Sequence, residues 1–250
     1  MKKVLYYEMR RTEIADATKQ NAVVIVPCGS TEQHGEHLPI NTDCTIVFEI
    51  AKKAAETLNE FPVLVLPPLW TGYSPHHMGF PGAITLRLAN YLDTLTGIAR
   101  SLHAHGFKNI LFLNGHGGNT PAVASMRYKM LDEEGFPVMG CDYWSLPGVT
   151  TEIKRVNEVD KGVPGHASEF ETSMALFLRP ELVEKGLIRW VPGVRGDPAP
   201  GTREKGEKLF NFIVNSLVGV LKDYHSGRLE ERLAWSKDMV ENSEAKEHKK

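Results

Sequence analysis

The sequence predicts an α/β protein of one domain, in which a mainly parallel sheet carries helices on both faces. Short apolar, β-branched runs alternate with longer segments whose apolar residues recur every three or four positions, and this alternation is typical of such a sheet. A hydrophobic fraction of 42% in 250 residues is sufficient for one sizeable core. We expect the domain to cover residues 1–240 and the polar segment 241–250 to be a disordered tail.

Four short apolar runs are predicted to be the strands of this sheet. They lie at residues 21–27, 63–66, 109–113 and 138–143. The first reads Ala-Val-Val-Ile-Val between an asparagine and a proline, which is typical of a strand buried on both faces. This run is expected to be the first strand of the core.

Apolar residues at helical spacing predict five helices, at residues 44–59, 88–102, 120–135, 168–178 and 204–224. Gly106 is suited to the left-handed position after the second helix, and Thr120 with Pro121 indicates an N-cap followed by the first helical residue. Two stretches lack such a pattern. The loop at 70–83 is too long to be a mere connection, and residues 144–165 are expected to be irregular.

The composition excludes several kinds of partner. A formal net charge of -2 without a basic cluster argues against nucleic acid. No apolar run approaches the roughly 20 residues that span a bilayer, and residues 1–11 lack the apolar core of a signal peptide. We therefore expect a cytoplasmic protein without a membrane partner, whose three cysteines, Cys28, Cys44 and Cys141, are buried thiols.

Histidines gather in the loops that follow the first three predicted strands. Five of the ten lie there, namely His34, His37, His76, His77 and His116. Parallel strands end at the same edge of a sheet, and ligand sites in open α/β sheets lie at that edge. The clustering therefore predicts a functional site at the carboxyl ends of the strands.

Carboxylates accompany these imidazoles. Glu32 and His34 are two residues apart, so in an extended segment both side chains point to one face. Asp43 and His116 are expected at the same edge, and mixed oxygen and nitrogen ligands suit Zn²⁺, Mn²⁺ or Fe²⁺. An aspartate shared by two ions would hold them about 3.5–4 Å apart, as in binuclear hydrolases. The residues thus predict a centre for divalent metal.

The same residues also have a structural explanation. Asp43 is suited to cap the helix that starts near Cys44. The glycine-rich segment 114–118 is suited to a turn that brings backbone close to a phosphate. Convergence of the side chains at one edge of the sheet favours the metal centre.

The segment 165–173 adds Glu171 and His166. Ser168 and Glu171 have the spacing of a capping box, which would give Glu171 a purely structural role. Glu169 and Glu171 lie about 200° apart on a helix, and only Glu171 shares a side with the apolar residues. We expect Glu171 to point inward as a metal ligand or general base, with His166 exchanging a proton beside it.

Three further side chains are predicted to bind a substrate. Trp144 follows the fourth strand and is suited to form a pocket wall, and His77 and Tyr73 belong to the long loop at 70–83. His37 is expected to orient a metal ligand, whereas Glu36 is expected to be solvated.

Taken together, these motifs resemble the creatininase (creatinine amidohydrolase) family. The resemblance covers roughly residues 20–180 and rests on Gly29–Gly35 with His37-Leu38-Pro39 and Asp43, Phe80-Pro81-Gly82, Asn114–Asn119 and His166–Ser173. It implies a three-layer α/β/α fold, a binuclear divalent metal centre, hydrolysis of a C–N bond in a cyclic or linear amide, and commonly a homohexamer.

The resemblance also implies which residues hold each ion. The first ion would be held by Glu32, Asp43 and His116. The second would be held by His34 and the bridging Asp43.

The chain departs from creatininase at one ligand. Creatininase has a metal-binding glutamate two residues after the histidine of its Asn-Gly-His motif, and this chain has Gly118 there. We expect Glu171 to replace that glutamate, with Glu169 as the alternative. The missing glutamate argues against creatinine as the substrate.

The predicted activity is hydrolysis of a small amide, such as a cyclic amide or a formamide, by a metal-activated water. Glu171 or His166 would pass the proton to the leaving nitrogen. Three alternatives stay open: hydrolysis of a ring ketone of the inosose type or a lactone, a nucleotide-binding module that uses the glycines at 114–119, and a metal-stabilised subunit without turnover. The expected partners are a small-molecule substrate and further copies of the chain.

Overall fold

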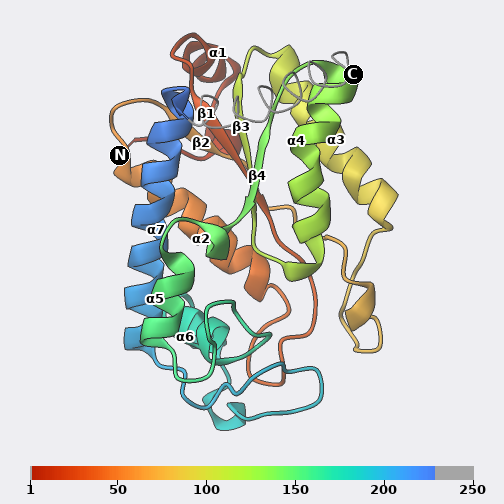
Figure 1. Cartoon of the computed structure of the whole chain (residues 1–250), viewed down its shortest axis with the longest axis vertical. Coiled ribbons are helices and arrows are strands. Elements are labelled where there is room, and N and C mark those ends of the chain that lie inside the picture. The colour runs from red at the N-terminus through yellow and green to blue at the C-terminus, as the bar shows by residue number, and fades with distance from the viewer. Residues whose placement is uncertain (1, 229–250) are drawn as a thin grey trace, which may run out of the picture.

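The sheet of the computed structural model, which describes residues 2–228, is parallel throughout (Figure 1). Its strands are β1 (Val23–Cys28), β2 (Val63–Val65), β3 (Asn109–Asn114) and β4 (Met139–Asp142). Their order is β2-β1-β3-β4, with Val24 of β1 opposite both Leu64 and Ile110. The four predicted strands are confirmed within about two residues at each end.

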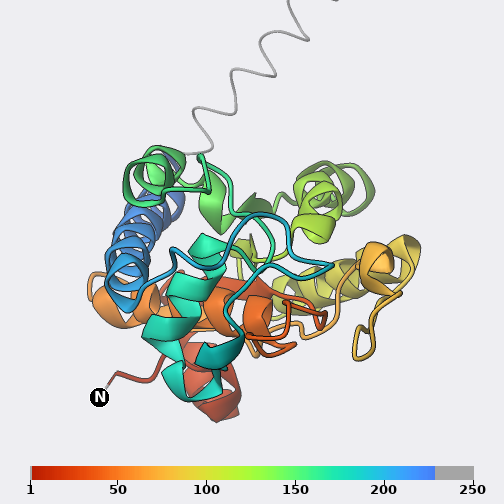
Figure 2. The same cartoon turned by 90° about the horizontal axis from the view of Figure 1, so that it is seen from below.

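Helices cover both faces of this sheet, so the predicted α/β fold is confirmed (Figures 1 and 2). One face carries α2 (Thr42–Thr57), α5 (Val149–Val156), α6 (Glu169–Leu178) and α7 (Arg203–His225). The other face carries α1 (Arg11–Lys19), α3 (Leu88–Ala104) and α4 (Thr120–Glu134). Among the described residues, no helix is both long and apolar enough to cross a bilayer.

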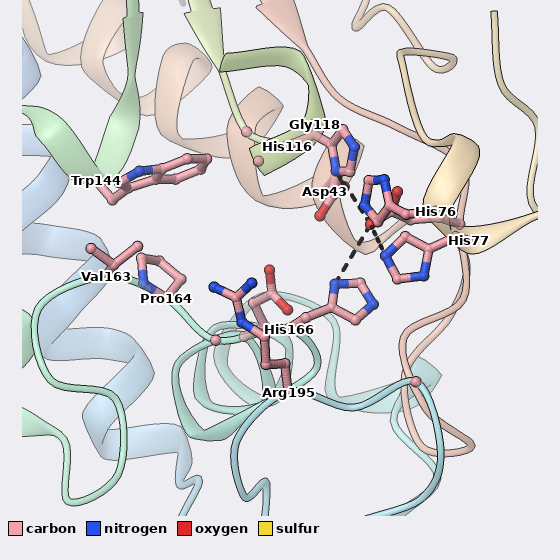
Figure 3. Close-up of a pocket in the computed structure, with 16 residues that line it drawn as sticks. Asp43, His76, His77, His116, Gly118, Trp144, Val163, Pro164, His166 and Arg195 are labelled. Carbon is pink, nitrogen blue, oxygen red and sulfur yellow. Dashed lines mark ion pairs between the residues drawn. The ribbon is translucent and has the colours of Figure 1, made fainter. Parts of the chain in front are cut away.

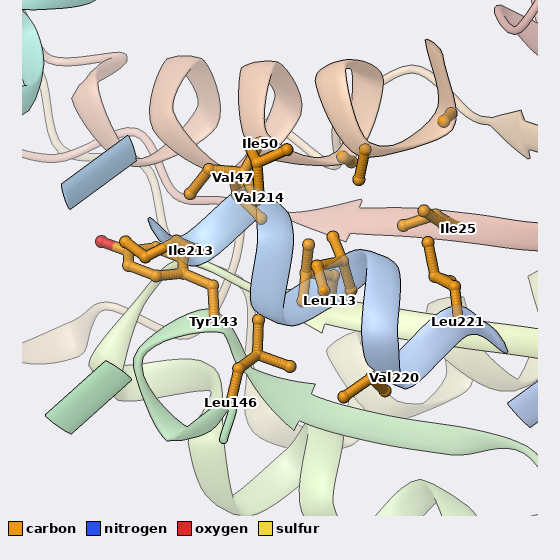
Figure 4. Close-up of a cluster of buried hydrophobic side chains, with 14 of the residues drawn as sticks. Ile25, Val47, Ile50, Leu113, Tyr143, Leu146, Ile213, Val214, Val220 and Leu221 are labelled. Atoms are coloured by element: carbon orange, nitrogen blue, oxygen red, sulfur yellow. The ribbon is translucent and has the colours of Figure 1, made fainter. Parts of the chain in front are cut away.

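Alternate residues of each central strand enter two separate cores. Ile25 packs with α2 and α7 on one face, whereas Val24 packs with α3 and α4 on the other. Figure 4 shows the first of these cores, in which Ile25 and Leu113 lie between Ile50 of α2 and Leu221 of α7. Burying one such side chain contributes about 1.5–3 kcal/mol. All six residues of β1 are buried, as expected for a strand covered on both faces.

Several helix boundaries differ from the prediction. Helix α2 begins at Thr42, so Asp43 lies in its first turn instead of capping it. Thr120, predicted as an N-cap, is the first residue of α4, and its hydroxyl donates to Asp142 at 2.9 Å. Gly106 follows α3 with a φ of 96°, as predicted. These shifts move helix ends by one or two residues and leave the order of elements unchanged.

Two helices were not predicted. Helix α5 lies inside the stretch expected to be irregular, and it buries only Val149 and Ile153. Helix α1 buries only Ala17. At eight and nine residues, both helices are shorter than the roughly 11–18 residues over which helical periodicity is judged. The predicted tail at 241–250 lies outside the described residues.

The strand order places a crevice at the carboxyl ends of β1 and β3. From β1 the chain continues to β2 on one side, and then returns to place β3 on the other side of β1. Loops that leave the two neighbouring strands therefore diverge, and this is where open α/β sheets bind ligands. The loops that begin at Gly29 and Gly115 both start at this crevice.

Candidate metal centre

Asp43 lies between two histidines that come from different strand ends. Its Oδ1 is 3.0 Å from His34 Nε2, and its Oδ2 is 3.0 Å from His116 Nδ1. Glu32 Oε1 is 3.2 Å from the same nitrogen of His116. All four side chains are buried. The structure thus brings together the four residues that the strand-end loops predicted. Three of them, Glu32, Asp43 and His116, line the cavity in Figure 3.

Glu171 completes this cluster from the first turn of α6. Its Oε2 lies 3.7 Å from His34 Nε2 and accepts a hydrogen bond from Ala167 N at 2.5 Å. The predicted capping box does not form in full, because the side chain of Ser168 makes no cap hydrogen bond. Glu171 therefore points inward toward His34.

Glu169 contacts residues outside the cluster. Its carboxylate accepts hydrogen bonds from the backbone N–H groups of Glu158 and Val159, both at 2.7 Å, and pairs with Lys205 at 2.5 Å. Of the two glutamates, only Glu171 is placed beside the other candidate ligands.

Backbone carbonyls fix which nitrogen of each imidazole faces the carboxylates. His34 Nδ1 lies 3.1 Å from Glu32 O, and His116 Nε2 lies 3.3 Å from Tyr73 O. A carbonyl oxygen only accepts, so these nitrogens carry hydrogen. The opposite nitrogens, His34 Nε2 and His116 Nδ1, are left to face the carboxylates, which is the orientation that metal-binding histidines require.

Two polar side chains whose roles were not predicted support His116. Ser74 Oγ lies 2.9 Å from His116 Nε2. Asn114 accepts from His116 N at 3.1 Å and donates to His116 O at 2.7 Å, and it also donates to Asp142 at 2.7 Å. The available signals were their positions, because Ser74 precedes a Pro-His-His sequence and Asn114 is the last residue of β3.

Gly118 occupies the position where creatininase carries a metal-binding glutamate. A Cβ atom at Gly118 would lie 2.2 Å from Tyr73 O and 2.4 Å from His116 Nε2. Both contacts are far shorter than van der Waals distance, and one involves backbone. The loop of residues 70–83 therefore fills the space that a side chain at this position would need.

Buried carboxylate oxygens without donors mark the centre as a cation site. Glu32 Oε1 and Asp43 Oδ2 are buried and receive no hydrogen bond from the described residues. Leaving such atoms unpaired costs about 1–3 kcal/mol each, more for a charged group. The mixed oxygen and nitrogen donors around them fit Zn²⁺, Mn²⁺ or Fe²⁺.

The titration behaviour of the cluster agrees with this assignment. Burial alone would lower the pKa of His34, but the carboxylates of Asp43 and Glu171 outweigh it and raise the pKa to about 10. Burial opposes the charge of His116 in the same way, and the neighbouring carboxylates of Asp43 and Glu32 raise its pKa to about 10. Burial raises the pKa of Glu171 to about 7. The carboxylates thus favour positive charge at both histidines, where protons or metal ions can supply it.

His166 lies beside the cluster with one nitrogen free. Its Nε2 donates to Gln33 O at 2.7 Å, which leaves Nδ1 3.5 Å from Glu32 Oε1. Burial lowers the pKa of His166 to about 3, with a smaller contribution from the positive charge of nearby His34. The side-chain Nε2 of Gln33 lies 3.1 Å from His77 Nδ1, so Gln33 contacts the rings of both His166 and His77. Gln33 was not predicted to have this role, although it lies between Glu32 and His34.

A cavity of about 480 Å³ opens onto this cluster (Figure 3). His77 and Trp144, which were predicted to bind a substrate, line this cavity. Tyr73 does not, because its side chain packs against the core on the α3 and α4 side of the sheet. His37 is buried and lies 2.9 Å from Thr172 Oγ1, so it contacts the residue next to Glu171 and not a candidate ligand.

Comparison with known proteins identifies the family. The sequence matches the family Creatininase, described as creatinine amidohydrolase, over residues 7–221. The chain belongs to the creatininase family. The family is described as an amidohydrolase and its relatives are enzymes, so the chain is an enzyme of this family.

Three relatives illustrate the range of reactions in the creatininase family. The chain is 31% identical to a mycofactocin precursor peptide peptidase of Mycolicibacterium smegmatis, over 82% of this chain and 87% of the relative. It is 27% identical to the creatinine amidohydrolase of Pseudomonas putida, over 81% of this chain and 90% of that protein. It is 28% identical to a 3-dehydro-scyllo-inosose hydrolase of Thermotoga maritima, over 73% of this chain and 58% of that protein.

Solved creatininase structures agree with the fold. A crystal structure of creatinine amidohydrolase superimposes with a TM-score of 0.77 and 25% identity, over 88% of this chain and 97% of the other. A mutant creatininase described as the Zn-Zn type superimposes with a TM-score of 0.75 and 26% identity, over 89% of this chain and 98% of the other. The three-layer architecture that the resemblance implied is therefore confirmed.

Proposed function

We propose that the protein hydrolyses a C–N bond of a small amide with two divalent cations held at the cluster around Asp43. The observation that carries this proposal is the pair of buried carboxylate oxygens, Glu32 Oε1 and Asp43 Oδ2, which receive no hydrogen bond from residues 2–228. Anions buried without donors are costly unless a cation neutralises them. Family membership supports hydrolysis as the reaction.

The ligands divide into two sets that share Asp43. One cation would be held by Glu32, Asp43 Oδ2 and His116 Nδ1. The other would be held by His34 Nε2, Asp43 Oδ1 and Glu171, so that Glu171 replaces the ligand lost at Gly118. The distances of 3.0 Å from each Asp43 oxygen to its histidine support this division. Zn²⁺, Mn²⁺ and Fe²⁺ all suit such donors.

When bound, the ions would supply an acidified water and a Lewis acid for the substrate carbonyl. His166 is suited to move the proton, because its Nε2 hydrogen is held by Gln33 O while Nδ1 faces the cavity. Glu171 Oε2 accepts a hydrogen bond from Ala167 N, which holds this carboxylate in place beside His34. We therefore propose that His166 transfers the proton to the leaving nitrogen and that Glu171 acts mainly as a metal ligand.

A second candidate substrate is a ring ketone of the inosose type or a lactone. It is favoured by the relative named as an inosose hydrolase, which has a comparable identity of 28%. The same activated water attacks any polarised carbonyl. A panel of cyclic amides, formamides, short peptides and inosose-type ketones would separate the two candidates by which member is consumed.

Assembly into a homohexamer is also proposed. Large apolar side chains remain exposed on the segment beside the site, namely Trp70, Met78, Ile84 and Leu88. Such side chains gathered on one segment are typical of an association surface. Sedimentation velocity on the purified protein would measure the mass of the assembly directly.

Replacement of His116 tests the proposed function. His116→Ala removes one ligand and should reduce metal content by at least one ion per chain, with turnover reduced by more than roughly 100-fold. His105→Ala is the matched control, because His105 is exposed at the end of α3. Elemental analysis of both variants gives the metal content. Full stoichiometry in His116→Ala would refute the proposed centre.

A further inference from the structure

Arg195 is the only lysine or arginine among the residues that line the cavity. The other charged or ionisable residues that line it are Glu32, Asp43, His76, His77, His116, His166 and Glu171. In Figure 3 the guanidinium of Arg195 points into the cavity, on the side of Val163 and Pro164 and below Trp144. A permanent positive charge therefore lies in the same cavity as the proposed centre.

The backbone of Arg195 is fixed to the segment that carries His166. Arg195 N donates to His166 O at 2.8 Å, and His166 N donates to Arg195 O at 2.9 Å. The next residue, Gly196, has a φ of 121°, and a Cβ atom there would lie 2.0 Å from Ser168 Oγ. Only glycine fits this turn. The segments around His166 and Arg195 are thus held close together. The same pairing therefore positions the backbone of both residues.

The guanidinium of Arg195 has no partner in the described part of the chain. No ion pair joins it to the carboxylates drawn in Figure 3. Its neighbours in sequence behave differently, since Arg189 pairs with Glu36 at 2.9 Å and Arg179 pairs with Glu181 at 2.5 Å. Arg195 lines the cavity and is exposed to solvent, so all five of its donors are available to a ligand.

The charge of the loaded site favours an anion. Three carboxylates, from Glu32, Asp43 and Glu171, face the cavity, and two divalent cations would more than neutralise them. Arg195 adds one further positive charge. A guanidinium binds carboxylate and phosphate groups through two parallel hydrogen bonds. A neutral substrate would leave this guanidinium hydrogen-bonded to water alone.

We propose that Arg195 binds an anionic group, a carboxylate or a phosphate, carried by the amide substrate. The scissile bond would lie toward His116 and His166, and the anionic group would lie toward Arg195 on the Val163 side. The apolar surface of Trp144 is suited to the part of the substrate that joins them. This inference rests on the proposed function, and it narrows the substrate to an acidic amide.

Binding of small probes tests the role of Arg195 without turnover. Calorimetry on metal-loaded protein would measure the Kd of benzoate, phenyl phosphate and neutral benzamide. Arg195→Gln should reduce the preference for the anion over benzamide by about 10–100-fold, the usual effect of losing a charged hydrogen bond. Arg195→Lys keeps the charge but loses the fork, so it should retain part of the preference. The probe that loses more affinity distinguishes carboxylate from phosphate.

Arg189→Gln is the matched control, because Arg189 lies on the same irregular segment, exposed and outside the cavity. It should leave the preference for the anion unchanged. Elemental analysis would show whether Arg195→Gln retains its metal, and Arg195→Lys tests the same contact if it does not. An unchanged preference in both Arg195 variants, or no preference in the wild type, overturns the inference. Loss of the preference in a protein that hydrolyses no amide supports the role of Arg195 and contradicts the proposed function alone.

Discussion

Ser74 Oγ donates its hydrogen to Glu32 Oε2 at 2.6 Å. Ser74 Oγ also lies 2.9 Å from His116 Nε2 and 2.6 Å from Ser30 Oγ. A serine hydroxyl has one donor and two acceptor lone pairs, and all three are used here. One fully buried side chain from the loop at 70–83 therefore orients two candidate ligands that follow different strands.

The first prediction concerns this hydroxyl. Ser74→Ala should weaken metal binding by about 10–100-fold, because partners that orient metal ligands typically have effects of this size. The reason is that Glu32 loses a donor and His116 Nε2 loses an acceptor. Competition against a chromophoric chelator would measure the affinity. Ser125→Ala removes a comparable hydroxyl from α4, far from the cavity, and should have no effect. Equal affinities in the two variants would show that Ser74 does not support the centre.

The second prediction compares adjacent glycines. Gly118→Ala should lower stability by roughly 1–3 kcal/mol, the usual cost of overpacking. It should also displace His116, because the new methyl group would overlap both Tyr73 O and the His116 ring. At Gly117 a Cβ atom would meet nothing within 4 Å. Thermal unfolding and metal analysis should therefore separate the two variants, and equal melting temperatures would argue against the tight packing at Gly118.

The third prediction separates the two glutamates of α6. Glu171→Gln should lose one of the two ions and keep its fold, because the amide oxygen can still accept from Ala167 N. Glu169→Gln should keep its metal but lower the free energy of unfolding by about 1.5–3 kcal/mol, the contribution of a hydrogen bond to a charged group. The reason is that buried Glu169 loses the charge that pairs with Lys205. Metal content and denaturant unfolding of both variants would show the contrast. Metal loss in Glu169→Gln alone would reverse the assignment.

The sequence predicted the strand-end residues because their placement follows from topology. Glu32 and His116 come directly after parallel strands that lie side by side, so any parallel pairing of β1 with β3 brings them to one edge. The inward direction of Glu171 followed from helical periodicity for a similar reason. Asp43 was placed at the right edge although the start of α2 was predicted two residues late.

Ser74, Gln33 and Arg195 could not be predicted in this way, because they depend on irregular backbone. Ser74 reaches Glu32 only because the loop at 70–83 folds over the end of the sheet, and Gln33 contacts His166 across 133 positions of sequence. No periodic pattern encodes such a path. Tyr73 shows the same limit, since it belongs to the expected loop but directs its backbone carbonyl, and not its ring, toward His116.

The final prediction is that metal stabilises the fold. Removing two cations would leave Glu32 Oε1 and Asp43 Oδ2 buried without donors, so the folded state alone benefits from the ions. Each metal at 100 times its Kd adds about 2.7 kcal/mol, so two add roughly 5 kcal/mol. For a domain of this size each kcal/mol raises the melting temperature by about 2–4 °C, so chelation of both ions should lower it by roughly 10–20 °C. His116→Ala should respond less to EDTA because it begins with less metal, and this difference separates loss of the ions from any general effect of the chelator. A metal-loaded protein whose melting temperature is the same with and without EDTA, despite confirmed removal of metal, would show that the buried carboxylates are stabilised by something other than cations.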